Sequence, residues 1–173
     1  MRSTTFQILF AFVLAACGGD GNGNGGPIDP GNGDDDIRGS YDAVHTFILN
    51  VGGFQDGIDC PGSLTITVLS AGEFSGLVSI GDCPEVDLDA ASGPVSGTVS
   101  DAGAVVIPLD EEDLAALEDF VAGIGCVVIS SEDAFTGTFD GDSITISFSA
   151  DLDCEDIAQD VTFEWRVTAT KIS

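Results

Sequence analysis

The sequence predicts an all-β protein, an eight-stranded antiparallel up-and-down β-barrel with one short helix between its fifth and sixth strands. Three observations support this fold class. From Gly39 onward apolar residues alternate with polar ones, which is the period of half-buried strands. Glycine-containing turns separate the alternating runs at the spacing of hairpins. Strands that share a single apolar face lose their free edges by closing into a barrel, and a two-sheet β-sandwich is the alternative.

The first segment, residues 1–16, has the anatomy of a signal peptide. One positive charge, Arg2, precedes an apolar stretch over residues 6–16. That stretch is too short to cross a bilayer as a stable helix, so we expect it to direct export and then to be removed.

The end of this segment, Leu14-Ala15-Ala16-Cys17, resembles the lipobox of bacterial lipoproteins. The resemblance implies that a lipid is attached to the Cys17 thiol and that a peptidase cuts before this cysteine. Several acyl chains on one residue give stable membrane attachment, where a single chain gives only marginal binding. Gly18 rather than aspartate follows Cys17. By the same resemblance, the protein is expected in the cell envelope, anchored to the outer membrane.

Residues 17–38 are expected to be the lipidated cysteine and a flexible tether. The run 18–36 is rich in glycine, asparagine and aspartate and has no apolar periodicity. As a flexible coil it would reach about 20–25 Å. Residues 20–25 also match the opening of a calcium loop, D-x-N-x-N-G, but Gly31 stands where that loop needs a glutamate.

The barrel domain is expected over residues 39–173. Its predicted strands are residues 41–49, 64–68, 74–80, 95–99, 105–109, 135–139, 144–148 and 161–171. A three-residue turn at 70–72 would place Val68 opposite Phe74 and Ile66 opposite Gly76. A turn at 101–103 would place Val99 opposite Val105. The third hairpin turns at Gly141-Asp142 and would place Gly137 opposite Ile146.

Three glycines face inward in these predicted hairpins, namely Gly76, Gly97 and Gly137. They allow the sharp bending that a small barrel needs, and this interpretation is favoured. The alternative is that they leave space inside the barrel for a ligand.

One segment has helical spacing instead. Acidic residues after Asp110 lead into apolar residues at 114, 117, 120, 121 and 124. Asp110 can cap this helix, and Gly123 or Gly125 can end it. We expect its apolar stripe to cover one mouth of the barrel or its wall.

The remaining four cysteines favour two disulfides in an exported chain. Extending the hairpin registers brings Cys60 close to Cys83 and Cys126 close to Cys154, and these are the predicted pairs. In an up-and-down barrel they would lie at the end that carries the long connections 50–62, 81–93, 110–125 and 151–160. Reduced thiols binding a metal are the alternative, although no C-x-x-C pair occurs.

The charge balance excludes some partners. Lys and Arg total 4 against 30 Asp and Glu, a formal net charge of −26. Nucleic acid is therefore not expected as a partner, because its binding requires cations that neutralise phosphates. Acidic residues at the loop end are candidates for a calcium site, but a solvated acidic rim is favoured. The candidate calcium ligands are Asp82, Asp87, Asp151 and Asp153.

No motif for catalysis is present. The single histidine, His45, is expected to project inward as a buried or pocket-lining residue, so we expect neither an enzyme nor a cofactor. A hydrolase built around His45 is the disfavoured alternative. The inward residues Tyr41, His45, Phe47 and Trp165 are the candidate ligand-binding positions.

The Gly39-Ser40-Tyr41 start and the Trp165-Arg166 pair on the last strand faintly resemble lipocalin-like barrels. This resemblance implies binding of a small apolar molecule. The expected function is therefore an anchored lipoprotein whose non-catalytic barrel binds a small apolar ligand or an envelope partner. A structural or assembly lipoprotein with a solid core is the alternative, and a calcium-binding surface domain is a further one.

Overall fold

The computed structural model describes residues 36–83 and 90–172. The predicted signal peptide, Cys17, residues 17–35 of the tether and Asp87 lie outside these ranges. Within them the strands are β1 (Gly39–Val51), β2 (Phe54–Ser70), β3 (Glu73–Ile80), β4 (Ala91–Val99), β5 (Ala104–Pro108), β6 (Cys126–Ser131), β7 (Ala134–Phe139), β8 (Ser143–Cys154) and β9 (Ile157–Lys171). The helix α1 (Glu111–Ala122) lies between β5 and β6.

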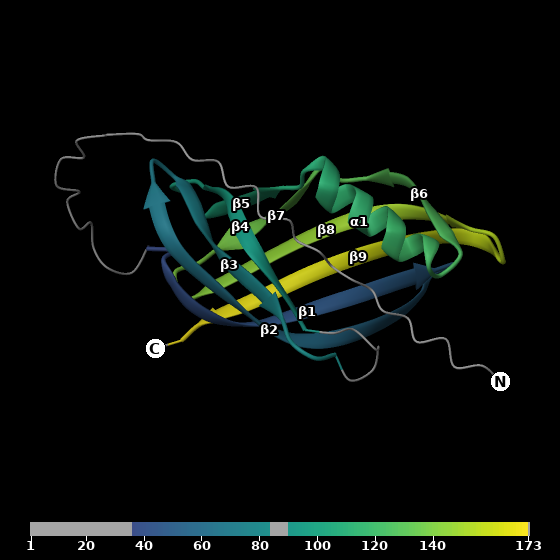
Figure 1. Ribbon diagram of the computed structural model, residues 1–173, viewed down its shortest axis with the longest axis horizontal. Coiled ribbons are helices and arrows are strands. Elements are labelled where there is room, and N and C mark those ends of the chain that lie inside the picture. The colour runs from purple at the N-terminus through teal and green to yellow at the C-terminus, as the bar shows by residue number, and fades with distance from the viewer. Residues whose placement is uncertain (1–35, 84–89, 173) are drawn as a thin grey trace.

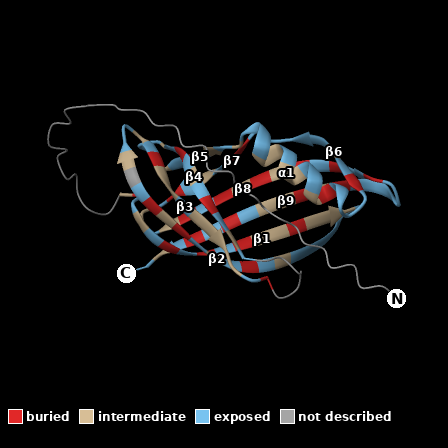
Figure 2. Cartoon of the chain, in the orientation of Figure 1, coloured by how far each residue is buried: buried red, intermediate tan, exposed pale blue. Residues whose placement is uncertain are grey.

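Eight of these strands close into an antiparallel barrel, which confirms the predicted fold class (Figure 1). The neighbours in the ring follow the order β7-β5-β4-β3-β2-β1-β9-β8, and pairing of β7 with β8 completes it. Buried and exposed residues alternate along the strands, as Figure 2 shows. This alternation of burial matches the alternation of apolar and polar residues in the sequence, because successive side chains in a strand point to opposite faces.

The core is formed by inward residues from every strand of the barrel and by the helix. Its buried members include Tyr41, Leu64, Ile66, Phe74, Val105, Val121, Phe148, Phe163 and Ala169. Within the described ranges, no helix is long and apolar enough to span a bilayer.

Two hairpin registers agree with the prediction and one differs near its turn. Val99 pairs with Val105, and Gly137 pairs with Ile146. In the first hairpin Ile66 pairs with Gly76 as predicted, but Val68 pairs with Ser75 instead of Phe74. The prediction was wrong there, because the turn has two residues rather than three.

The backbone dihedral angles of its two central residues fit this shorter turn. Ala71 has φ 55° and Gly72 has φ 81°, the signs that a two-residue hairpin of type I′ requires. A shift in register between Ile66 and Val68 absorbs the extra residue as a bulge.

Two of the expected long connections are strands joined by tight turns. β1 continues to Val51 and β2 begins at Phe54, with Gly52 and Gly53 between them in the left-handed region. The expected connection at 151–160 is likewise the tip of the β8–β9 hairpin. Pairing along the neighbouring strand outweighs the low strand propensity of the glycine- and aspartate-rich sequence after Gly52.

Strand β6 was not predicted. It pairs with residues 150–154 of β8, next to the part of β8 that the start of β7 pairs with, so β6 and β7 border the same strand in succession. The helix before it has the predicted cap. The Asp110 side chain accepts hydrogen bonds from the backbone N–H groups of Glu112 and Asp113, at 2.9 and 3.0 Å. Asp113 accepts from the Asp110 N–H in return, which completes a capping box.

Helix α1 covers the inner face of the sheet at the end where β8, β9 and β1 extend. Val121 is buried, and the ring of Phe120 lies 6.2 Å from that of Phe163 on β9. Figure 1 shows the helix crossing β8 and β9. The apolar stripe of the helix therefore closes this end of the core.

Candidate functional site

The four candidate ligand-binding residues lie together on the inner faces of two adjacent strands. Tyr41, His45 and Phe47 alternate along β1, and Phe47 pairs with Trp165 on β9. Tyr41 and His45 are fully buried, whereas Phe47 and Trp165 are half-buried against the core. The sequence therefore predicted correctly that these side chains share the interior.

Tyr41 is held by the chain just before the barrel. Its hydroxyl donates a hydrogen bond of 2.6 Å to the carbonyl of Ile37. Burial, with smaller contributions from the charges of Asp36 and Asp142, raises the pKa of Tyr41 to about 12. The phenol is therefore a neutral structural donor that fixes the entry of the chain into β1.

Both ring nitrogens of His45 have protein partners. Nδ1 lies 3.3 Å from the indole Nε1 of Trp165, and Nε2 lies 3.2 Å from the carbonyl oxygen of Ser79. The indole N–H can only donate and the carbonyl can only accept. His45 is therefore the tautomer with its proton on Nε2, which donates to Ser79, while Nδ1 accepts from Trp165.

This arrangement holds the imidazole neutral. Burial lowers the pKa of His45, and the hydrogen bond to the Ser79 carbonyl opposes that shift only in part. A second proton, on Nδ1, would also point at the Trp165 N–H. Two donors would then face each other and the hydrogen bond between them would be lost. His45 thus orients Trp165 inside the barrel and is engaged at both nitrogens.

The barrel interior around Trp165 is occupied by aromatic rings from four strands. The ring of Trp165 lies 5.1 Å from Phe47 on β1 and 5.1 Å from Phe135 on β7. Phe135 in turn lies 5.4 Å from Phe148 on β8. These distances are those of favourable aromatic contacts. The rings thus link β1, β9, β7 and β8 across the core.

The inward glycines have no free space beside them. A Cβ at Gly76 would overlap the carbonyl of Thr65, and one at Gly137 would overlap that of Thr145. At Gly97 a Cβ would lie 2.8 Å from the ring of Phe74. The glycines let neighbouring strands and rings approach closely, which supports the bending role and leaves no room at these positions for a ligand.

The structure pairs the cysteines as predicted. Cys60 is bonded to Cys83 and Cys126 to Cys154, with Cα–Cα distances of 4.9 and 4.0 Å. Cys60 lies inside β2 opposite His45 rather than in a loop, whereas Cys83 lies in the connection that follows β3, as expected. Cys126 and Cys154 are direct partners between β6 and β8.

The candidate calcium ligands are spread over the sheet. Asp82 precedes Cys83, which is bonded to β2, whereas Asp151 and Asp153 lie on β8. Strands β1 and β9 separate β2 from β8. Among the described residues, no group of three histidine, cysteine, aspartate or glutamate side chains is arranged to hold a metal.

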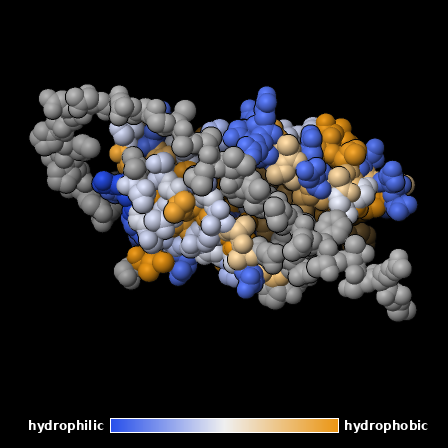
Figure 3. Space-filling model, viewed as in Figure 1, coloured by the Kyte–Doolittle hydropathy of each residue, from blue (hydrophilic) through white to orange (hydrophobic). Residues whose placement is uncertain are grey.

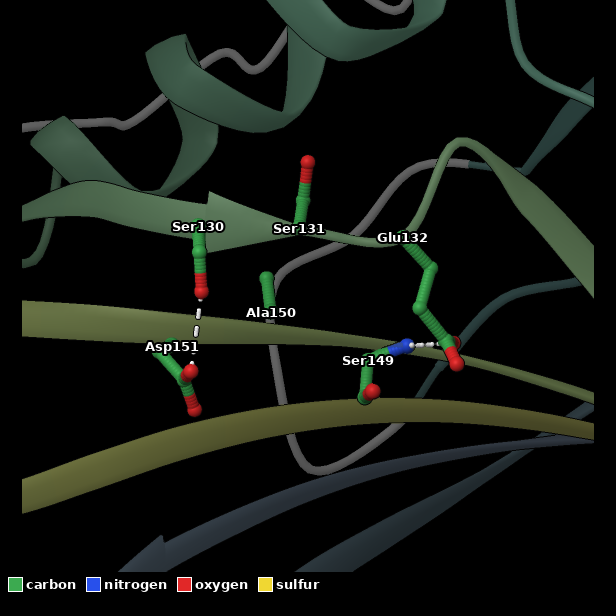
Figure 4. Close-up of a pocket in the computed structure, with 6 residues that line it drawn as sticks. All are labelled: Ser130, Ser131, Glu132, Ser149, Ala150 and Asp151. Atoms are coloured by element: carbon green, nitrogen blue, oxygen red, sulfur yellow. Dashed lines mark hydrogen bonds between the residues drawn. The ribbon is translucent and has the colours of Figure 1, made fainter.

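A shallow polar groove of about 240 Å³ lies where β6 gives way to β7 (Figure 4). The hydroxyl of Ser130 donates to Asp151 at 2.9 Å, and the backbone N–H of Ser149 donates to Glu132 at 2.7 Å. This groove was not predicted, and the polar run Ser130-Ser131-Glu132-Asp133, which interrupts the apolar residues on either side, was the sequence signal that could have located it. Its lining residues are Ser130, Ser131, Glu132, Ser149, Ala150 and Asp151.

Comparisons with known proteins identify designed barrels. No protein-family model matches the chain, and no curated protein matches it. Among solved structures, a redesigned β-barrel is 13% identical with a TM-score of 0.40, covering 79% of this chain and 92% of its own. A de novo designed fluorescence-activating β-barrel is also 13% identical, with a TM-score of 0.30, covering 75% of this chain and 92% of its own.

Proposed function

We propose that this chain is an exported lipoprotein, anchored to the outer membrane by a lipid on Cys17, that presents a solid, non-catalytic β-barrel to partners in the cell envelope. The observation that carries the proposal is the aromatic packing of the interior. Trp165 contacts Phe47 and Phe135 at 5.1 Å each and is hydrogen-bonded to His45. A filled interior directs recognition to the outer surface.

A small apolar ligand is the other use expected of the barrel. Such a ligand would have to displace rings that already contact one another across four strands. It would also have to separate Trp165 from His45, leaving a buried imidazole nitrogen without its donor. Leaving a buried polar group unpaired costs about 1–3 kcal/mol, so the packing favours an external partner.

The test uses Trp165, which is the single tryptophan of the chain. The purified protein is titrated with N-phenylnaphthylamine, a neutral apolar dye, while indole and dye fluorescence are recorded. We expect no saturable signal from the wild type. A Phe135→Ala variant, shown by circular dichroism to be folded, opens a cavity beside Trp165 and serves as the positive control. Saturable binding by the wild type would contradict the solid barrel.

A further inference from the structure

Strand β6 has one free edge. It pairs with β8 on one side, and among the described residues no strand pairs with its other side. A strand edge presents unpaired backbone N–H and C=O groups that can accept another strand. β6 is therefore a ninth strand of the described sheet and lies outside the closed ring of eight.

The side chains of this strand expose an apolar surface. Val127 is 60% exposed and Ile129 is 68% exposed, and Ile124 just before the strand is 52% exposed. Figure 3 shows hydrophobic surface at the end of the molecule where β6 and α1 lie. Native sheets protect free edges with charges, prolines or bulges. β6 has a bulge at Ile129, but its residues 126–131 include neither a charge nor a proline.

Carboxylates surround this apolar strand. Glu132 and Asp133 follow it directly, and Asp153 on β8 pairs with Val127. At the other end Glu155 donates its backbone N–H to the carbonyl of Gly125 at 3.2 Å. The four carboxylate side chains are exposed. The free edge of β6 thus has an uncharged central part, with carboxylates at both of its ends and on the neighbouring strand β8.

The described cations do not neutralise these carboxylates. Arg38 is paired with Asp36, and Arg166 with Glu164 at 2.6 Å. The Lys171 ammonium donates to the Asp36 carbonyl at 2.8 Å, at the far end of β9 from β6. A partner that brings its own positive charge would therefore gain electrostatic attraction here.

We propose that the free edge of β6 binds an extended, cationic segment of a partner protein, which adds a strand with apolar residues at its centre and Lys or Arg at its ends. Backbone hydrogen bonds would supply affinity, and Val127 and Ile129 would contact the central side chains. A second copy of this chain fits less well, because it would bring another set of carboxylates to the same edge.

This inference deepens the proposed function by naming the class of envelope partner. The experiment uses the full chain in a neutral detergent and a fluorescent peptide, KKVTVTVKK, with binding followed by anisotropy. We expect saturable binding that weakens as salt is raised. The peptide EEVTVTVEE tests the charge requirement, and KKVTPTVKK tests the backbone requirement, because proline removes a donor and disfavours a strand. Both controls are expected to lose binding.

The site is tested by the double variant Val127→Thr/Ile129→Thr, which keeps β-branched residues and so preserves strand propensity. We expect binding to weaken about tenfold or more, which corresponds to roughly 1.4 kcal/mol. Leu77→Thr is the matched control, because Leu77 is also 60% exposed but lies on β3, which is paired on both sides. Its binding should be unchanged.

Equal binding of EEVTVTVEE would overturn the inference, and so would any one of three further results. They are no binding of KKVTVTVKK, equal binding of the proline peptide, and equal binding by the double variant. A concentration-dependent dimer that the double variant abolishes would also overturn it, because a second copy would then occupy the edge. None of these binding measurements depends on Cys17. A failure of the peptide to bind would therefore not contradict the anchoring proposal, and a failure of anchoring would not contradict the binding of a partner at β6.

Discussion

His45 is fully buried, and its neutral state is built into the barrel by two hydrogen bonds. Its pKa in the folded protein is lowered, so between that pKa and the ordinary value near 6.5 the unfolded chain binds more protons than the folded chain. The contribution of His45 to stability is therefore fully present above about pH 6.5 and is lost as the pH falls toward the folded pKa.

The first prediction follows from this sign. Urea unfolding of the wild type and of His45→Gln, compared at each pH, should show an extra loss of stability in the wild type between about pH 7 and pH 5. The loss should reach at most about 2 kcal/mol near pH 5. Comparison with the variant removes the effect of the many carboxylates, which both proteins share. A constant difference between the two proteins over this range would show that His45 is not held neutral.

Gly62 on β2 gives His45 the space it occupies. A Cβ at this position would lie 2.6 Å from Nε2 of His45 and would overlap the Ser79 carbonyl. Gly62→Ala should therefore destabilise the protein by about 1–3 kcal/mol, the usual cost of overpacking a core. The measurement is the free energy of unfolding in urea.

Gly57→Ala is the control for this variant, because Gly57 lies on the same strand and its Cβ would meet ordinary contacts at 3.5 Å or more. We expect a much smaller change there. Equal costs for the two variants would mean that the loss comes from glycine replacement in a strand and not from the approach to His45.

At the scale of elements, the cap of α1 carries a separate prediction. Asp110→Ala removes the side chain that accepts from the N–H groups of Glu112 and Asp113. We expect a loss of about 1 kcal/mol in the free energy of unfolding. Glu118→Ala, on the exposed surface of the same helix, should change stability by less than about 0.5 kcal/mol. A cap variant as stable as this control would show that the helix is held by packing alone.

The elements that sequence reasoning predicted are those with a clear period. The alternation along 64–68 and 144–148 and the glycines at the turns were sufficient for the hairpins and, through their registers, for both disulfides. Helix α1 was predicted because a capping aspartate and apolar spacing agreed. In each case local propensity and tertiary packing favour the same structure.

The misses have a common physical cause. β6 reads CVVISS, in which Val127 and Ile129 are apolar although they face outward, so no alternation signals the strand. The sequence after Gly52 has the composition of a loop, yet pairing with β1 makes it strand. The two-residue turn at Ala71-Gly72 required a positive φ at alanine, which its residue type does not suggest.

For the site, the sequence predicted which side chains point into the barrel but not which of them contact one another. That Tyr41, His45, Phe47 and Trp165 share the interior follows from the period of the strands. The hydrogen bond between His45 and Trp165 depends on pairing between β1 and β9, strands from opposite ends of the domain, whose register no local pattern specifies. The hydrogen bond from His45 to the Ser79 carbonyl could not be predicted either, because every residue has a backbone carbonyl and the residue type does not indicate its partner.

At the scale of the whole molecule, a barrel with aromatic packing around Trp165 carries a strongly negative net charge. The chain has a formal net charge of −26, and the aromatic packing around Trp165 directs recognition outward. The free edge of β6 supplies an uncharged centre within that surface. Such a net charge opposes self-association and favours encounters with cationic groups.

The most direct test of this account is the membrane fractionation of wild type and Cys17→Ser expressed in a bacterium with an outer membrane. Wild type should sediment with the outer membrane and carry the mass of attached acyl chains. Cys17→Ser should appear in the soluble fraction with an unchanged far-ultraviolet circular dichroism spectrum and both disulfides intact, because the barrel begins at Gly39, well after residue 17. A Cys17→Ser protein that still sediments with the membrane would contradict the proposal that a lipid on Cys17 anchors the barrel.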